Sequence, residues 1–509
     1  MLAKAIWLRI GQFLVVFSLL AAWMLSVITS YGQALEWSQP VPLSQPGRKS
    51  WFPDVAADAT GRVHVVWASD VTGYDTVMYT TSQDGLNWSA VNDIMALPQA
   101  AGSEATRPTL LIDRHDLMHM TFRDTRVLYS QAPVASAYLA GAWLSPHTMS
   151  ASQVAYFSRV VQDSHDTLHL VFTENVLSST CPICYHVFYR RSEDHGLNWS
   201  PAIDISGFAT GSAKPQLVVD GQDNLHLVWE AGRGGSYGQL VDPTKVMYAA
   251  SYDRGHTWRP PSDLNAPDTV AKDIAIGLDG DSNLLAVWLS LPEDKVYYRV
   301  SNDQGRFWSS PQAVPGVWGG RTIYDARLDD YSMATDSAGD VHLALVGRVA
   351  EDQSSLSVLH VVWDGSAWSG PDAITTLVGD APEWPRLAIG NGNQLSVVWF
   401  VRDEAHIFDP DNGQQYQVWY ARGLSSAPAV TAVALPLLTP TSETQVAPAS
   451  PLPPTPAPTP TPSRPRFLTP VPSGSTSTET DELLLLVESL LPVILLIAVV
   501  AIGVRFRRR

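Results

Sequence analysis

A segment of about ten residues recurs seven times along the chain and limits the possible folds more than any other feature. Most copies read as an Asp, a turn, a His and an apolar strand, and successive copies start 50 to 59 residues apart. A short strand with an aromatic residue follows each copy, and then usually a Trp that opens another strand. Four short strands per unit, repeated at this period, are typical of a β-propeller blade. The copies begin at Asp58, Asp113, Asp163, Asp220, Asp279, Asp336 and Gly390.

The Trp-containing strand is displaced by one unit relative to the rest of the repeat. Trp37, in EWSQPVPL, precedes the first copy, and nothing similar follows the last. We therefore expect the N-terminal strand to pair with the last blade, which closes the ring without an open sheet edge. The sequence predicts an all-β, seven-bladed β-propeller over residues 35–425.

The stretch SYDRGHTW at 251–258 combines a carboxylate, hydroxyls and a histidine, as a catalytic site would. It recurs as SEDHGLNW at 192–199 and SNDQGRFW at 301–308, whereas a catalytic site occurs once. In a turn, the Asp accepts backbone N–H bonds, the Gly adopts positive φ and the Trp buries a large apolar face. We interpret these as structural turns, formed by Ser192, Asp194, Gly196 and Trp199, by Ser251, Asp253, Gly255 and Trp258, and by Ser301, Asp303, Gly305 and Trp308.

The pattern S-x-D-x-G-x-x-W resembles the Asp-box, or bacterial neuraminidase repeat, of the sialidase-like β-propellers. The resemblance covers residues 35–425 and implies a propeller, but it carries no catalytic residue. Sialidases, other glycosidases and non-catalytic binding proteins share this motif. The resemblance therefore leaves enzyme and recognition module as alternatives.

If the chain is a sialidase, the resemblance implies three arginines around the substrate carboxylate, a Tyr nucleophile activated by a Glu, and an Asp acid/base. The residues that fit by their place at strand ends or in loops are Arg107, Arg327 and Arg386 for the carboxylate, Tyr324 as nucleophile, Glu230 (or Glu174) as activator and Asp124 (or Asp70) as acid. The chain departs from sialidases, which have six blades and an N-terminal F-R-I-P. Here SWFPD at 50–54 lacks the Arg, and the most similar stretch, TRPT, stands at 106–109.

The other hypothesis is a recognition protein that binds an extracellular glycan or protein ligand at the face where the first strands begin. Trp51 and Trp384 then offer stacking surfaces, and the same arginines bind acidic groups. A purely structural surface protein is a third alternative. We expect a monomer without a cofactor.

Both ends of the chain indicate export and membrane attachment. Residues 1–34 form a signal peptide or N-terminal anchor, in which Lys4 and Arg9 precede an apolar run and Gly32 and Ala34 mark a cleavage point. Residues 426–482 are a Pro/Thr-rich stalk, 483–504 a transmembrane helix and 505–509 a basic cytoplasmic tail. The propeller is thus expected outside the cell, at the cell membrane.

Charge and cysteine content exclude further classes. The net charge is −17, with basic residues scattered except at the C-terminus, which argues against a nucleic-acid partner. The chain has two cysteines, Cys181 and Cys184, for which an extracellular disulfide is expected; a zinc site would need two more ligands. The DPDNG stretch at 409–413 is interpreted as a turn rather than a calcium site, and the repeated His as structural.

Overall fold

The computed structural model describes one propeller and leaves the chain ends outside the description. The described residues are 35–71, 74–98, 106–176, 184–207, 211–233, 242–291, 293–320, 328–377, 379–403, 416–431 and 435. They all belong to the first of two compact units, Met1–Thr439; the second is Pro440–Arg509. Residues 1–34 and the predicted stalk, membrane span and tail from 436 onward lie outside the described residues.

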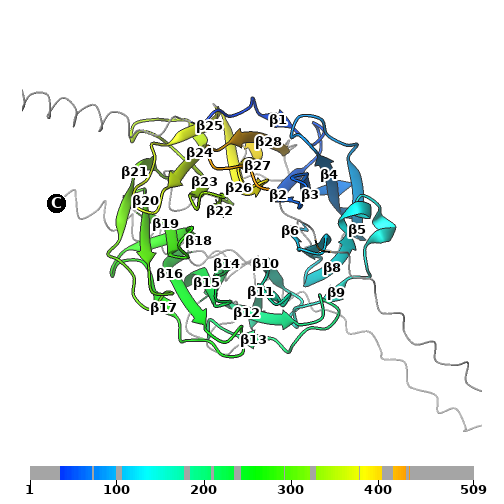
Figure 1. The fold of residues 1–509 in the computed structure, drawn as a ribbon, viewed down its shortest axis with the longest axis horizontal. Coiled ribbons are helices and arrows are strands. Elements are labelled where there is room, and N and C mark those ends of the chain that lie inside the picture. The colour runs from blue at the N-terminus through cyan, green and yellow to red at the C-terminus, as the bar shows by residue number, and fades with distance from the viewer. Residues whose placement is uncertain are drawn as a thin grey trace, which may run out of the picture. The chain divides into compact units, whose positions relative to one another are not determined.

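Seven antiparallel four-stranded sheets form the blades of the ring (Figure 1). Blade 1 contains β2 (Ser50–Ala57), β3 (Val63–Val71), β4 (Tyr74–Ser82) and β5 (Asn92–Pro98). Blade 2 contains β6 (Thr109–Ile112), β7 (Leu117–Arg123), β8 (Val127–Pro133) and β9 (His147–Thr148), with 3₁₀ turns η1 (Val134–Ser136) and η2 (Ala140–Ala142). Blade 3 contains β10 (Ala155–Gln162), β11 (Leu168–Val176), β12 (Cys184–Ser192) and β13 (Ile203–Asp204). Blade 4 contains β14 (Gly211–Val219), β15 (Leu225–Arg233), β16 (Asp242–Ser251) and β17 (Ser262–Asp263).

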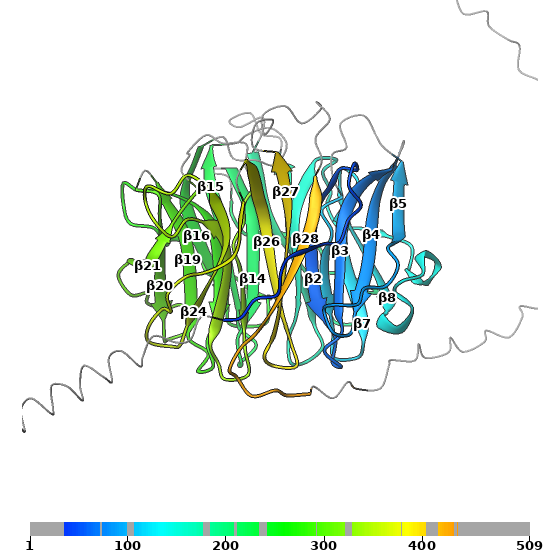
Figure 2. The same cartoon turned by 90° about the horizontal axis from the view of Figure 1, so that it is seen from above.

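The remaining blades complete the circle. Blade 5 contains β18 (Val270–Leu278), β19 (Leu284–Leu291), β20 (Lys295–Ser301) and β21 (Gln312–Trp318). Blade 6 contains β22 (Ser332–Thr335), β23 (Val341–Gly347), β24 (Leu356–Trp363) and β25 (Asp372–Leu377). Blade 7 contains β26 (Asp380–Gly390), β27 (Gln394–Asp403) and β28 (Gln417–Leu424), with β1 (Val41–Pro42) as its outer strand. The first strand of every blade lies nearest the ring centre, and Figure 2 shows the blades from the side.

Blade 7 is closed by the N-terminal strand, as the displaced Trp predicts. Val41 pairs with Tyr420 and Pro42 with Trp419, and Trp37 forms an isolated bridge to Gly423. The Leu43 N–H donates to the Val418 carbonyl at 2.9 Å. The seven-bladed all-β ring and its closure are therefore confirmed.

The core consists of apolar clusters between and within blades, because alternate residues of each half-buried strand point toward a neighbouring sheet. The second strands are largely buried, and β19 (Leu284–Leu291) is buried along its whole length. Among the described residues, no helix is long and apolar enough to cross a membrane.

Candidate functional site

The first strands of six blades share a backbone distortion at or near their N-terminal ends. Six non-glycine residues at this position have positive φ, namely Phe52, Arg107, Phe157, Lys214, Asp273 and Trp384. In five of the six blades the register of the first two strands shifts at this point. Positive φ is uncommon for bulky residues and concentrates where a structure is over-determined or functional. At this position each of the six blades supplies a side chain that contacts a residue of another blade.

On one side of the axis these side chains form an aromatic cluster around an arginine. The Arg107 guanidinium carbon lies 4.2 Å from the Phe52 ring centroid and 5.0 Å from that of Phe157. Trp384 packs on Phe52 at 5.1 Å and on Phe157 at 6.1 Å between centroids. Blades 7 and 3 are not neighbours, so the Trp384–Phe157 contact crosses the axis. Aromatic faces attract a desolvated guanidinium, which accounts for the burial of Arg107 at 5% exposure.

On the other side of the axis the cluster is ionic. The Lys214 ammonium lies 2.7 Å from an Asp273 carboxylate oxygen and 3.3 Å from Glu230. Lys214 also donates to the Asp329 carbonyl of blade 6, which again crosses the axis. The Asp273 backbone N–H donates to Glu230 at 2.6 Å. The Lys214 ammonium thus contacts two carboxylates whose side chains are buried.

The charges in this ionic cluster set the protonation of its members. Burial acts to lower the pKa of Lys214, but Asp273 and Glu230 outweigh it and raise that pKa. Burial acts to raise the pKa of Asp273, but Lys214 and Lys272 outweigh it and lower that pKa. For Glu230, burial prevails over Lys214 and raises the pKa of the carboxyl. Lys214 and Asp273 therefore form the ion pair, and Glu230 is the group that holds a proton more readily.

A second layer of paired charges lies one or two residues further along the first strands. Arg386 donates to Asp330 at 2.7 Å, and the Gln216 amide donates to the other Asp330 oxygen at 3.0 Å. Arg159 contacts Asp54 at 3.2 Å, between blades 3 and 1. Burial and the charge of Arg159 lower the pKa of Arg386 to about 10 despite Asp330, so Arg386 is still a cation at neutral pH. The cations Arg386 and Arg159 are thus paired with the protein's own carboxylates.

The residues predicted for a sialidase site are only partly brought together. Tyr324 and Arg327 lie outside the described residues. Arg107 and Arg386 both reach the axis, but Arg107 is stacked on phenyl rings and Arg386 is bonded to Asp330. Glu230 faces Lys214 and Asp273.

Asp124 lies in a turn of blade 2, and the two predicted tryptophans are buried. The Asp124 carboxylate accepts N–H bonds from Thr125 and Arg126 of its own turn and pairs with the Arg126 guanidinium. Trp51 and Trp384 are 9% and 6% exposed and pack in the core, Trp51 against Phe52 and Tyr416. They therefore offer no open stacking surface.

The carboxylates that pair with these cations and the aromatic partners of Arg107 were not predicted from the sequence. A signal for the distortion is present, because Pro follows the positive-φ residue at Pro53, Pro108, Pro215 and Pro385. Pro restricts the preceding residue and marks an irregular strand start. No comparable pattern marks Asp54, Asp273 or Asp330 as partners of cations.

The SYDRGHTW stretch is a turn that joins two blades. The Ser251 hydroxyl donates to Asp253 and accepts the Gly255 N–H, both at 2.8 Å, and Asp253 also accepts the Thr257 N–H. The Trp258 ring meets Tyr189 of blade 3 edge-to-face at 5.1 Å. The same edge-to-face contact joins Trp199 to Tyr129 and Trp308 to Tyr248, and the same Ser–Asp–Gly bonding recurs at Ser192, Asp194 and Gly196 and at Ser301, Asp303 and Gly305.

The repeated His belongs to the same interlocking structure. His169 bonds Tyr189 at 2.8 Å through Nδ1 and lies 3.3 Å from Asp163 through Nε2, all within blade 3. The tyrosine, rather than the His, faces the neighbouring blade. The arrangement recurs for His64 with Tyr79 and Asp58, His119 with Tyr129 and Asp113, and His226 with Tyr248 and Asp220.

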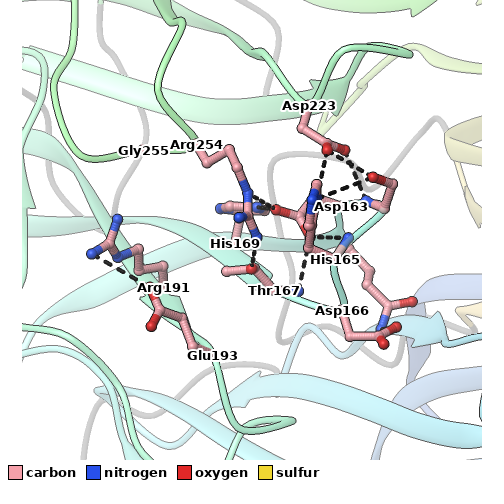
Figure 3. A network of polar contacts seen from close by, with 12 residues as sticks. Asp163, His165, Asp166, Thr167, His169, Arg191, Glu193, Asp223, Arg254 and Gly255 are labelled. Carbon is pink, nitrogen blue, oxygen red and sulfur yellow. Dashed lines mark hydrogen bonds and ion pairs between the residues drawn. The ribbon is translucent and has the colours of Figure 1, made fainter.

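Figure 3 shows the polar contacts between blades 3 and 4 on the face where the first strands end. Arg254 donates to Asp163 at 2.7 Å, and Asp223 contacts His165 at 2.8 Å. Within the described residues, Asp163, His165 and Asp223 are the group whose ligand atoms could surround a cation, within 4.8 Å of one another. The Asp163 oxygens already accept bonds from Arg254 and from backbone N–H groups, so the cluster works as a blade-to-blade contact.

Cys184 begins β12 and is disulfide-bonded. The only other cysteine of the chain, Cys181, lies outside the described residues.

Comparison with known proteins places the chain in a fold but in no family. No protein-family model matches it, and no curated protein matches it. An ulvan lyase, a polysaccharide lyase, is 9% identical over 72% of this chain and 95% of its own, with a TM-score of 0.50. The Penicillium chrysogenum α-L-arabinanase is 14% identical over 75% and 98%, at 0.41. The Ruminococcus gnavus intramolecular trans-sialidase is 9% identical over 72% and 94%, at 0.40. The similarity to the ulvan lyase, at 9% identity, shows the β-propeller fold alone.

Proposed function

We propose that this protein is an exported, membrane-anchored recognition module of the sialidase-like, Asp-box type, and that it binds a glycan on its rim rather than hydrolysing one at its axis. One observation carries the proposal. Arg386, which a sialidase would use for the substrate carboxylate, is 2% exposed and paired with Asp330. An arginine that already satisfies an internal carboxylate cannot clamp a second one without stranding the first.

The rim of the same face offers better contacts for a ligand. Tyr74, at the hairpin between β3 and β4, is 50% exposed and presents an amphipathic ring. Asp70, Arg126 and Asp380 lie at the same level around the ring, where second strands end and first or third strands begin. These side chains can hydrogen-bond sugar hydroxyls while the ring stacks on a sugar face.

A binding assay with a matched pair of tyrosines tests the proposal. Full-length protein in detergent is applied to an array of sialylated, uronic-acid, sulfated and neutral oligosaccharides. We expect saturable binding that Tyr74→Ala weakens at least tenfold. Tyr138→Ala is the control, because Tyr138 is 48% exposed but lies between η1 and η2, on the other side of blade 2. Absence of glycan binding, or equal loss in both variants, would overturn the glycan proposal and direct attention to a protein ligand.

Hydrolysis is the second candidate, and Glu230 favours it. Burial raises the pKa of this carboxyl, as is common for a catalytic acid. Fluorogenic sialoside turnover by the wild type, lost in Glu230→Gln and Tyr324→Phe, would establish an enzyme. Turnover below the detection limit in all three proteins supports recognition.

A further inference from the structure

The first described residue of the chain is held by a carboxylate on the outer strand of blade 6. The Leu35 backbone nitrogen donates to the Asp372 carboxylate at 3.1 Å. The Leu35 side chain packs beside Trp37 against Gly423, whose added Cβ would lie 3.1 Å from each of them. The segment is thus anchored at blades 6 and 7 before β1 begins.

The Leu35 amide is a neutral donor, so this hydrogen bond does not balance the negative charge of the Asp372 carboxylate. In the described residues its other close charged or titratable neighbour is His360, 3.6 Å away and buried on β24. Burial lowers the pKa of His360, although Asp372 opposes the shift. His360 in turn bonds His342 at 2.8 Å, and His342 bonds Asp336 at 3.1 Å. A neutral His pair leaves the Asp372 carboxylate in need of a cation.

The sequence supplies a way to make one. Gly32 and Ala34 place small residues three and one positions before the Ala34–Leu35 bond, the pattern that a signal peptidase cleaves. Hydrolysis of that bond consumes one water, leaves a carboxylate on Ala34 and converts the Leu35 amide nitrogen into an α-ammonium group. That nitrogen is the atom that Asp372 already contacts.

We propose that a signal peptidase cleaves the chain after Ala34, and that the new Leu35 α-ammonium forms an ion pair with Asp372 that fixes the closing segment. Processing thereby strengthens the ring, because a charged donor to a carboxylate contributes about twice what a neutral one does. This ion pair would form during maturation and does not depend on which ligand the rim binds.

The test combines identification of the N-terminal residue with a double-mutant cycle. Full-length protein is exported, purified in one detergent and analysed by N-terminal peptide mass spectrometry. The thermal unfolding midpoint is measured for the wild type, Asp372→Asn, the cleavage-blocked Ala34→Arg, and the double variant. The membrane segments are common to each pair, so their contribution cancels in the cycle.

We expect Leu35 as the N-terminal residue and a larger fall in midpoint from Asp372→Asn in the cleaved protein than in the Ala34→Arg background. Asp93 lies at an exposed position of the equivalent outer strand β5. Asp93→Asn should therefore leave the unfolding midpoint unchanged both in the cleaved protein and in the Ala34→Arg background. A different N-terminal residue, or equal effects of Asp372→Asn in both backgrounds, overturns the proposal. The N-terminal analysis of the wild type decides the cleavage site even if a variant fails to fold.

Discussion

The Tyr189 hydroxyl of blade 3 fills the space beside Gly255 of blade 4, and a Cβ added to Gly255 would lie 1.8 Å from that oxygen. The same relationship joins Tyr129 to Gly196, at 1.9 Å, and Tyr248 to Gly305, at 1.7 Å. The hydroxyl also bonds His169 of its own blade. A single tyrosine thus connects the His and Asp of one blade to the turn of the next.

Gly255→Ala should therefore destabilise the propeller for two separate reasons. Gly255 has φ of 81°, and an L-residue in that region costs about 1–2 kcal/mol. The clash with Tyr189 adds about 1–3 kcal/mol, as overpacking does. The measurement is the urea unfolding midpoint of the purified protein.

Two glycine controls separate these terms. Gly47 has φ of 82° with nothing near its added Cβ, so Gly47→Ala should show the conformational cost alone. Gly141 is in open space without positive φ, and Gly141→Ala should be nearly neutral. Equal midpoints for Gly255→Ala and Gly47→Ala would show that the tyrosine contact is unimportant.

Tyr189→Phe should lower stability by about 1–3 kcal/mol, because it leaves the buried His169 Nδ1 without its partner. The edge-to-face contact with Trp258 survives in this variant, so the loss reports the hydroxyl. Unfolding is followed by Trp fluorescence against urea. Tyr74→Phe, which alters an exposed hydroxyl, should change the midpoint little; comparable losses in both variants would contradict the role of the His–Tyr bond.

The ring was predictable because its determinants are local and repeated. Turn residues such as Asp253 and Gly255 stand at fixed offsets, and the position of Trp37 before the first repeat reveals how the ring closes. Strand period and turn chemistry act over a few residues, so one sequence displays them directly.

The axis was not predictable in the same way. In the sequence, Arg386 is an arginine near the start of a strand. Nothing in the sequence distinguishes a substrate carboxylate from Asp330, in the preceding blade, as its partner. Lys214 of blade 4 reaches blade 6, a contact that depends on how seven sheets converge. Such pairings have no period, and only the repeated Pro after the distorted residue signals that the strand starts are unusual.

Acid should weaken the propeller through its Asp–His pairs. Burial acts to raise the pKa of Asp58, but hydrogen bonds from His64 and Thr60 outweigh it and lower that pKa from 3.8 to about 2; Asp220 shifts likewise to about 2. A lowered folded-state pKa contributes stability that is complete above the unfolded pKa and is lost as pH falls through the folded value. We expect the unfolding midpoint to fall between about pH 5 and pH 2.

Asp58→Asn identifies the contribution of one pair. The variant should be less stable than the wild type at pH 7, and the difference should shrink toward pH 2, because the wild-type carboxyl then gains a proton. Asp93→Asn serves as the exposed control. A difference between Asp58→Asn and the wild type that stays constant from pH 7 to pH 2 would contradict the assignment.

The paired charges of the axis predict a non-additive response to mutation. Arg386→Met removes the cation that faces Asp330 and leaves a carboxylate of 4% side-chain exposure uncompensated, which should cost about 3–5 kcal/mol. Adding Asp330→Asn removes that charge while keeping an acceptor for the Gln216 amide, so the double variant should regain part of the loss. Both are compared by urea unfolding with Arg48→Met, a change at an exposed arginine that should be neutral. If the double variant is less stable than Arg386→Met alone, Arg386 does not serve to balance the charge of Asp330. The better hypothesis would then be that Arg386 binds the carboxylate of a ligand.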